Sequence, residues 1–334
     1  MLAYERVRLR LSHRARWGAL SEREVLRVRL AFAPDDWGEG EAAPLEPYDG
    51  VPLAAVAAAL DAYGAVLRNA GPDAPHAELL AACAAERDLP QALAAVDLAL
   101  WDRAGRRAGA PVARLLAPEA PAAVPVNALV GAEDRAGAAA EAAAAARAGF
   151  RCVKVKVGVG DDAGRLAAVR AAVGPEVLVR ADADGAWATP AEALAHLRAL
   201  AGADLELCEE PVHGVEALRA LRAASPVPIA MDETDAPGSG AADAVCLKVS
   251  RGGITGVLRA ARAARAAGAR VYVSSTLDGP LGIAAGVHVA AALRTSGPVA
   301  HCGLATLPDA FPPRGGAIAV PRGPGLLGGR AATS

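Results

Sequence analysis

The sequence has little of what marks secreted or membrane-spanning proteins. Its five cysteines, an odd number, include no CxxC pair, which argues against a disulfide framework. It has no run of about 18 uncharged apolar residues, so no membrane-spanning helix is expected. The first residues, MLAYERVRLRL, lack the apolar core of a signal peptide. These absences together predict a cytoplasmic protein.

A large excess of charge of either sign is also missing. The formal net charge is −2 and the pI is about 6.3, which gives no basis for binding nucleic acid or an anionic membrane surface. Hydrophobic residues make up 53% of the 334 residues, enough for the core of one large domain or two moderate ones.

From about residue 123, short apolar runs alternate with alanine-rich runs. The apolar runs predict strands and the alanine-rich runs predict helices. The expected strands are 124–131, 152–158, 177–183, 204–210, 227–233, 244–250, 270–276 and 298–303, and the expected helices are 133–149, 162–173, 190–202, 214–224, 254–268 and 280–294. Eight strands alternating with helices indicate parallel βα units, most simply a (β/α)7β-type TIM barrel over residues 119–304.

Two local signals refine this barrel. The sequence TPAE at 189–192 is a capping box with Pro190 at the first helical position, so a helix is expected to begin there. Residues 234–243, TDAPGSGAAD, carry a proline and two glycines. We therefore expect a loop, and no helix, between the fifth and sixth strands.

The two ends of the chain have other patterns. In residues 1–118, RVRLRL and VLRVRLAF alternate like antiparallel strands joined by a hairpin loop at 12–24, and helices are expected at 51–70, 76–86 and 90–106. This predicts a separate α+β capping domain. Residues 305–334 have too much glycine and proline for another βα unit, and we expect them to return to the capping domain.

Charged side chains close five successive strands of the expected barrel. In chain order they are Lys154 and Lys156, then Asp182, Glu209, Asp232 and Lys248. Because the carboxyl ends of parallel strands meet at one mouth of a barrel, these charges are expected to gather there. Three carboxylates on adjacent strands repel each other unless a cation lies between them, and all-oxygen ligands favour Mg²⁺. Glu209 is chosen over Glu210 because it shares the inward phase of the leucines before it.

Lysines flank this expected Mg²⁺ site on both sides. A lysine near a divalent cation and a second lysine is expected to have a lowered pKa, so that it can act as a base. A metal that binds a substrate carboxylate stabilises the enediolate formed when the α-proton leaves. The set therefore suits proton abstraction alpha to a carboxylate. Two lysines on one face of one strand, Lys154 and Lys156, would keep one of them neutral near pH 7.

The motifs KVKVG, RADADGAW, CEEP, AMDET and LKVSRGG, in this order and spacing, resemble the enolase superfamily, and more closely its muconate-lactonizing branch. Residues 274–293 and HCGL at 301–304 look most like the o-succinylbenzoate synthases. The resemblance implies a Mg²⁺-dependent lyase of menaquinone biosynthesis with a small-molecule carboxylate substrate. It would convert a succinyl-hydroxy-cyclohexadiene carboxylate to o-succinylbenzoate by syn-dehydration. Whether the chain forms a homo-oligomer is left open.

The resemblance also implies a role for each charged residue. Lys156 would remove the α-proton, Lys154 would tune it, and Lys248 would stabilise the enediolate from across the ring. The metal ligands would be Asp182, Glu209 and Asp232, and the expected substrate contacts are Asp184, Asn127, Arg180 and Ser274. A loop at 12–18, with Trp17, is expected to close over the barrel mouth. The family usually has asparagine where Asp184 stands, so that contact can differ here.

Three alternative functions remain open. An N-acylamino-acid racemase or dipeptide epimerase would use Lys156 and Lys248 as acid and base on opposite faces of the substrate. Ser274-Ser275-Thr276 in place of a Gly-Gly-Met type strand, and no DxD after the eighth strand, favour the synthase. A Schiff-base lysine enzyme would not need the three carboxylates. A degenerate barrel that only binds partners would not need the lysines.

Overall fold

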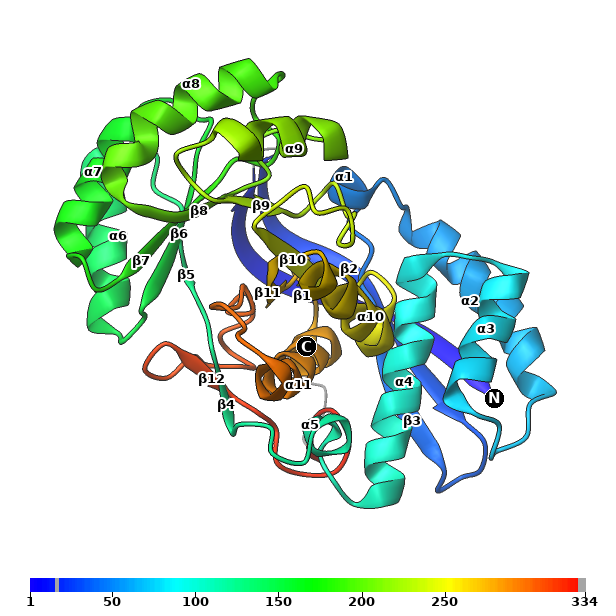
Figure 1. The fold of residues 1–334 in the computed structure, drawn as a ribbon. Coiled ribbons are helices and arrows are strands. Elements are labelled where there is room, and N and C mark those ends of the chain that lie inside the picture. The colour runs from blue at the N-terminus through cyan, green and yellow to red at the C-terminus, as the bar shows by residue number, and fades with distance from the viewer. Residues whose placement is uncertain (16–17, 330–334) are drawn as a thin grey trace.

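The protein is described here from a computed structural model that covers residues 1–15 and 18–329. Its N-terminal part is an antiparallel sheet in the order β1 (Leu2–Ala15), β2 (Gly18–Ala31) and β3 (Trp37–Ala42). The sheet is followed by the helices α1 (Glu46–Asp49), α2 (Leu53–Arg68), α3 (His76–Glu86) and α4 (Pro90–Ala108). Figure 1 shows this α+β unit beside the rest of the chain.

The expected hairpin and the three longer helices are confirmed, but two details differ. The hairpin strands run further than predicted, because β1 and β2 include most of 12–24. The third strand, WGEGEA, was not predicted, since its glycines and glutamates show no apolar alternation. The expected closing loop lies partly outside the described residues: Trp17 is not described, nor are the side chains of 12–19.

The second unit is a curled sheet of seven parallel strands, neighbours in space in the order in which they occur in the chain. They are β5 (Ala128–Val130), β6 (Cys152–Lys156), β7 (Leu178–Asp182), β8 (Leu205–Glu209), β9 (Ile229–Met231), β10 (Ala244–Lys248) and β11 (Arg270–Ser274). Segment 299–303 bonds to both edges of this sheet: Ala300 N–H donates to the Val271 carbonyl at 3.1 Å, and Asn127 N–H donates to the Cys302 carbonyl at 3.0 Å. The two outer strands are thereby linked.

Helices pack on the outside of the curled sheet (Figure 1). They are α6 (Arg135–Arg147), α7 (Asp162–Val173), α8 (Pro190–Leu200), α9 (Val215–Ala224), α10 (Gly253–Ala266) and α11 (Pro280–Leu293), with short 3-10 turns at Ala201–Ala203 and Arg294–Ser296. The helix start expected at Pro190 is confirmed, and the Thr189 hydroxyl caps it by accepting from Glu192 N–H. The loop expected at 234–243 is also confirmed, since no helix separates β9 from β10 there.

One predicted strand is two strands in the structure. The run 124–131 divides into β4 (Ala123–Pro125) and β5, with Val126 and Asn127 between them. β4 pairs antiparallel with β12 (Ala317–Ala319), whereas β5 pairs parallel with β6. The apolar run is continuous, so the sequence pattern alone could not show that its two halves have different partners.

The C-terminal segment reaches back to the first unit. Leu326 N–H donates to the Asp102 carboxylate on α4 at 2.7 Å. Val112 N–H, at the start of α5 (Val112–Leu116), donates to the Gly325 carbonyl at 3.3 Å. These contacts agree with the expected return of residues 305–334, while the domain limits at 118 and 304 stay predictions.

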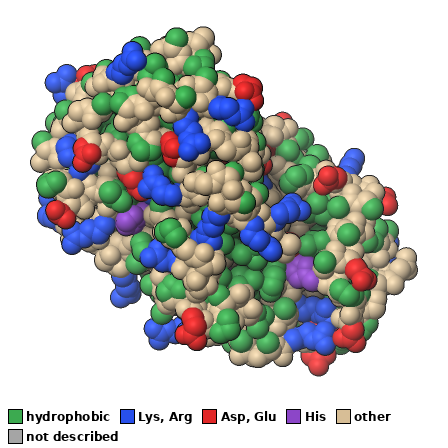
Figure 2. All heavy atoms as spheres, viewed as in Figure 1, with side chains coloured by type: hydrophobic (Ala, Val, Ile, Leu, Met, Phe, Trp, Pro, Cys, Tyr) green, Lys and Arg blue, Asp and Glu red, His purple; other side chains and the backbone are tan. Residues whose placement is uncertain are grey.

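Charged side chains of both signs lie on the described surface. Basic and acidic side chains are interspersed on the face in Figure 2, in keeping with the small net charge. Among the described residues, no helix combines the length and the hydropathy needed to cross a membrane. All five cysteines are buried and unpaired, as expected for small core residues.

Strand β3 lies close to helix α4 because glycines face the helix. A Cβ added at Gly40 would lie 2.0 Å from the Ala95 carbonyl oxygen and 2.8 Å from the Ala99 nitrogen, both atoms of the α4 backbone. A backbone cannot move aside as a flexible side chain can. The N-terminal sheet therefore tolerates only glycine at this contact.

Gly40→Ala is expected to lower the free energy of unfolding by about 2 kcal/mol or more, because the methyl group forces β3 away from α4. Gly71→Ala is the matched control, since a Cβ there meets nothing within 4 Å. Its expected change is under about 1 kcal/mol. Urea denaturation of both variants measures the difference, and equal midpoints would show that the sheet does not pack as described.

Candidate active site

A cavity of about 480 Å³ lies at the carboxyl ends of the parallel strands. Its lining includes all six charges that the sequence brought forward: Lys154, Lys156, Asp182, Glu209, Asp232 and Lys248. The strand order places the three acidic strands β7, β8 and β9 between the lysine strands β6 and β10. The predicted gathering of these charges at one rim is therefore what the structure shows.

Lysine occurs nowhere else in the sequence, where every other basic side chain is arginine or histidine. The Lys154 Nζ lies 2.8 Å from the Asp182 carboxylate and 2.7 Å from that of Glu209. The Lys156 Nζ lies 2.7 Å from Asp182 and 2.6 Å from Asp184. Lys156 has the most exposed side chain of the three lysines, at 28%, so it is the one most open to a ligand.

A second charge cluster forms around Asp232 on the other side of the cavity. The Lys248 Nζ lies 2.6 Å from its Oδ2. The Tyr48 hydroxyl, which comes from α1 of the N-terminal unit, donates to its Oδ1 at 2.8 Å. Arg251 donates to the Asp232 carbonyl at 2.8 Å and to the Tyr48 hydroxyl at 2.5 Å. Both units of the fold therefore contribute to this wall.

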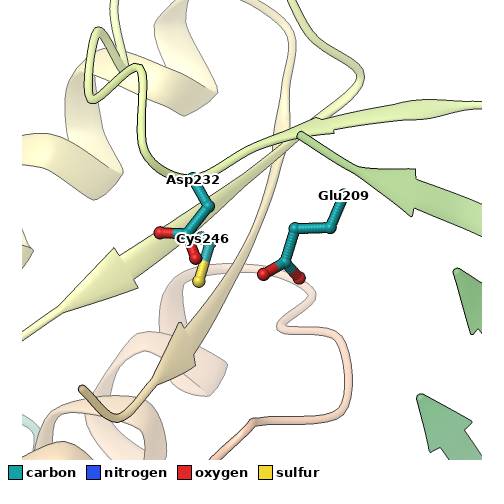
Figure 3. Close-up of side chains that lie close together, drawn as sticks. All are labelled: Glu209, Asp232 and Cys246. Atoms are coloured by element: carbon teal, nitrogen blue, oxygen red, sulfur yellow. The ribbon is translucent and has the colours of Figure 1, made fainter. Parts of the chain in front are cut away.

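Glu209 and Asp232 point toward one another from adjacent strands, as Figure 3 shows. One carboxylate oxygen from each and the Cys246 sulfur lie within 4.8 Å of one another. Burial raises the pKa of the Cys246 thiol well above its usual range, so the sulfur keeps its proton and is a poor ligand. The Oδ1 of Asp182 is buried without a hydrogen-bond partner. This set of oxygen donors, with one oxygen unpaired, fits a hard divalent cation such as Mg²⁺.

The choice of Glu209 over Glu210 agrees with the geometry. Glu209 points into the cavity, where the Tyr272 hydroxyl donates to it at 2.6 Å. Glu210 is fully buried elsewhere and accepts from Asp232 N–H at 2.7 Å and from Thr234 N–H at 3.0 Å. Glu210 therefore fixes the backbone that presents Asp232 and does not face the cavity.

The four expected substrate contacts separate into two groups. Asp184, Asn127 and Ser274 line the cavity. Arg180 does not: its fully buried guanidinium bonds to Glu206 at 2.6 Å and to the His301 carbonyl at 2.7 Å. The expectation of a substrate contact at Arg180 is thus not supported. Arg180 lies two residues before Asp182 on β7 and so points to the same face of the sheet, but deeper inside it. The alternating sequence pattern shows the face of a residue and not its depth.

The lowering of the lysine pKa was expected beside a bound divalent cation, and in the protein without one the neighbouring carboxylates act in the opposite direction. Burial acts to lower the pKa of Lys156, but the attraction of Asp182 outweighs it and the pKa is raised. The pKa of Lys154 is raised well above its ordinary value for the same reason, with Asp182 and Glu209 as partners. Burial raises the pKa of Glu209 to about 7. For Lys156, the ion pairs with Asp182 and Asp184 outweigh the repulsion from Lys154.

Sequence reasoning missed Tyr48, Arg251 and Tyr272, which all contact the carboxylates. Arg251 stands three residues after Lys248 in LKVSRGG, so its position in the motif was a usable signal. Tyr272 lies two residues before Ser274 on β11 and shares its inward phase. Tyr48 comes from a short helix of the other unit, and the sequence gives no sign that this helix reaches the cavity.

Lys154→Met is expected to lower the free energy of unfolding by about 3 kcal/mol in EDTA. The buried carboxylates of Asp182 and Glu209 then lose the lysine ammonium group that pairs with both of them. The double variant Lys154→Met/Glu209→Gln is expected to recover part of this loss, since one uncompensated charge is removed with it. Chemical denaturation of the three proteins gives the comparison. A single variant as stable as the original protein would mean that this ion-pair cluster is absent.

Comparison with known proteins gives three findings. The family model described as Enolase C-terminal domain-like matches residues 137–327. The chain is 41% identical over 200 residues to the o-succinylbenzoate synthase of Thermobifida fusca, a match that covers 55% of this chain and 60% of that protein. It is 31% identical over 215 residues to the N-succinyl-L-Arg/Lys racemase of Bacillus cereus, covering 60% and 58%. The matches thus span about three fifths of these two relatives.

Solved structures of similar fold point to the same superfamily. The dipeptide epimerase from Cytophaga hutchinsonii, complexed with Mg and the dipeptide D-Ala-L-Val, superimposes with a TM-score of 0.83 at 25% identity. That superposition covers 97% of this chain and 94% of the epimerase. The family model alone spans more than half of the 334 residues. The chain therefore belongs to the enolase superfamily, in the family described as Enolase C-terminal domain-like.

Proposed function

We propose that the protein is a cytoplasmic, Mg²⁺-dependent dehydratase of menaquinone biosynthesis built on a (β/α)7β-type barrel. It would convert a succinyl-hydroxy-cyclohexadiene carboxylate to o-succinylbenzoate. One observation carries the proposal: a lysine pair, three acidic strand ends and a further lysine line one cavity in unbroken strand order. This arrangement suits removal of a proton alpha to a carboxylate.

The residues proposed to hold Mg²⁺ are Asp182, Glu209 and Asp232. Their support is the all-oxygen donor set, the closeness of Glu209 to Asp232 and the unpaired Oδ1 of Asp182. When bound, Mg²⁺ supplies positive charge that offsets the three carboxylates and stabilises negative charge developing on the substrate carboxylate.

Lys156 is proposed as the base, because it is the most exposed lysine of the cavity. It would take the proton from the carbon alpha to the carboxylate, and the C–H electron pair would pass into the carboxylate as an enediolate. The pair would then return to the ring as the C–O bond breaks, and the proton on Lys156 would leave with the hydroxyl as water. Atoms and charge balance, and the ring becomes aromatic.

The other cavity residues would hold the substrate in place. Lys248 lies across the three acidic strands from Lys156, where its charge would stabilise the enediolate from the other side. Lys154, tied to Asp182 and Glu209, would set the local charge around Lys156. Asp184, Asn127 and Ser274 are proposed to contact the succinyl arm or the ring, since they line the same cavity.

Racemisation of an N-succinyl amino acid is the second candidate. It is favoured by the two lysines that line one cavity from strands on either side, and by the similarity to the Bacillus cereus racemase. The dehydratase is preferred because the identity to the Thermobifida fusca synthase is higher, at 41% against 31%. The hydroxyl-rich end of β11, with Ser274, Ser275 and Thr276 on the cavity wall, also supports it.

With Mg²⁺ present, the purified protein is expected to form o-succinylbenzoate from the cyclohexadiene substrate, followed by absorbance. EDTA is expected to abolish the reaction. Lys156→Ala is expected to lower kcat at least about a thousandfold, because the proton then has no positioned base. Arg259→Ala on α10 is the matched control, since this exposed side chain lies outside the cavity lining, and it should match the unmodified protein.

The racemase alternative has its own signature. In deuterium oxide, a racemase would place deuterium at the α-carbon of N-succinyl amino acids without net loss of material. Folded, metal-loaded protein that exchanges this hydrogen but makes no o-succinylbenzoate would replace the dehydratase with the racemase. If it does neither, the proposed function fails while the family assignment stands.

A further inference from the structure

The loop at 275–279, between β11 and α11, forms part of the cavity wall. Ser275, Thr276 and Leu277 all line the cavity. Leu277 has a φ of +61°, a left-handed conformation that a branched, bulky side chain rarely adopts. Such a conformation persists only where the surroundings hold it in place. What holds it here comes from the N-terminal sheet.

Glu41 on β3 caps the helix that follows this loop. Its Oε1 accepts from Gly279 N–H at 2.6 Å. The N-cap residue of α11 is Gly279, which has no side chain to cap the helix. A Cβ added at Gly279 would lie 2.4 Å from the Glu41 Oε2, so the carboxylate packs directly on the backbone. A residue 238 positions away thus does the work of a local N-cap.

Arg23 on β2 grips the same loop from its other end. Its Nη1 donates to the Thr276 carbonyl and, at 3.2 Å, to the Leu277 carbonyl, while its Nη2 donates to the Pro44 carbonyl. Arg23 is 7% exposed and Glu41 is 6% exposed. The planar guanidinium therefore joins the N-terminal unit to the backbone carbonyls before and after Leu277.

The loop's own side chains complete the contact. The Thr276 hydroxyl donates to Asp278 at 2.8 Å, and Asp278 N–H donates to the Ser275 hydroxyl at 2.8 Å. Asp278 is 1% exposed and lies near the Arg23 charge. Burial and the Asp278 charge raise the pKa of Glu41 to about 7. One buried arginine thus faces two carboxylates, which ties the three groups into one cluster.

We infer that Glu41 and Arg23 are positioning residues for substrate binding: from the N-terminal sheet they hold the 275–279 loop in the shape that walls the cavity. This rests on the proposed function, because it assigns the loop to the binding of that substrate. Neither residue lines the cavity, so their effect passes through the loop. They should therefore affect KM more than kcat.

Hydrogen–deuterium exchange read by mass spectrometry tests the positioning without any substrate. Glu41→Ala is expected to speed amide exchange in 275–281 about tenfold or more, because the helix end loses its cap. The control is Glu39→Ala, on the same strand and outside this contact, which should leave the segment unchanged. Unchanged exchange in Glu41→Ala would overturn the inference, whether or not the protein is a dehydratase.

Kinetics give the second readout. Glu41→Ala is expected to raise KM for the cyclohexadiene substrate about tenfold with kcat within about threefold, as expected for loss of binding that is uniform along the reaction. Glu41→Gln keeps one acceptor oxygen and should fall between Glu41→Ala and the unmodified protein. If Glu41→Ala does not fold, Glu41→Gln and Arg23→Lys take its place in both measurements. A tenfold fall in kcat with an unchanged KM would contradict the proposal that Glu41 positions the 275–279 loop for substrate binding.

Discussion

The site depends on compensating buried charge. The three proposed metal ligands and the three lysines project into one cavity and lie mostly buried, where an unpaired charge is very costly. Each carboxylate has an amine within 2.8 Å, and Lys154 serves Asp182 and Glu209 together. The lysines therefore have two roles. Without a bound cation they neutralise the carboxylates, and they also lie beside the space that a substrate would occupy.

The frame that brings these charges together comes from both units of the fold. The parallel order of the strands sets the sequence of charges around the rim. The N-terminal unit then adds Tyr48 to the Asp232 cluster, and places Arg23 and Glu41 against the loop after β11. Leu11, Leu20 and Ser21 of the N-terminal hairpin border an adjoining hollow that also contacts Lys154 and Lys156. The cavity thus lies between the N-terminal unit and the parallel sheet, and both supply residues to its walls.

Much of this could be predicted from the sequence, because βα periodicity and strand-end charges are local signals. The strand ends at Lys156, Asp182, Glu209 and Lys248 follow directly from alternating apolar runs. The depth of a residue within the sheet is not local, so the pattern could not show that Arg180 lies outside the cavity lining. Contacts between units, such as those of Tyr48, Arg23 and Glu41, depend on how two separately patterned segments dock. The raised pKa of Lys156 depends on ion-pair distances that no one-dimensional pattern contains.

Calorimetric titration with Mg²⁺ tests the central claim most directly, which is that Asp182, Glu209 and Asp232 act as one cation site. The account predicts one ion per chain, with affinity falling at least about tenfold in Asp182→Asn, Glu209→Gln and Asp232→Asn alike, since each removes a charged ligand. Glu216→Gln, an exposed acid on α9, should bind as the unmodified protein does. No binding, or binding that survives all three substitutions, would contradict the account.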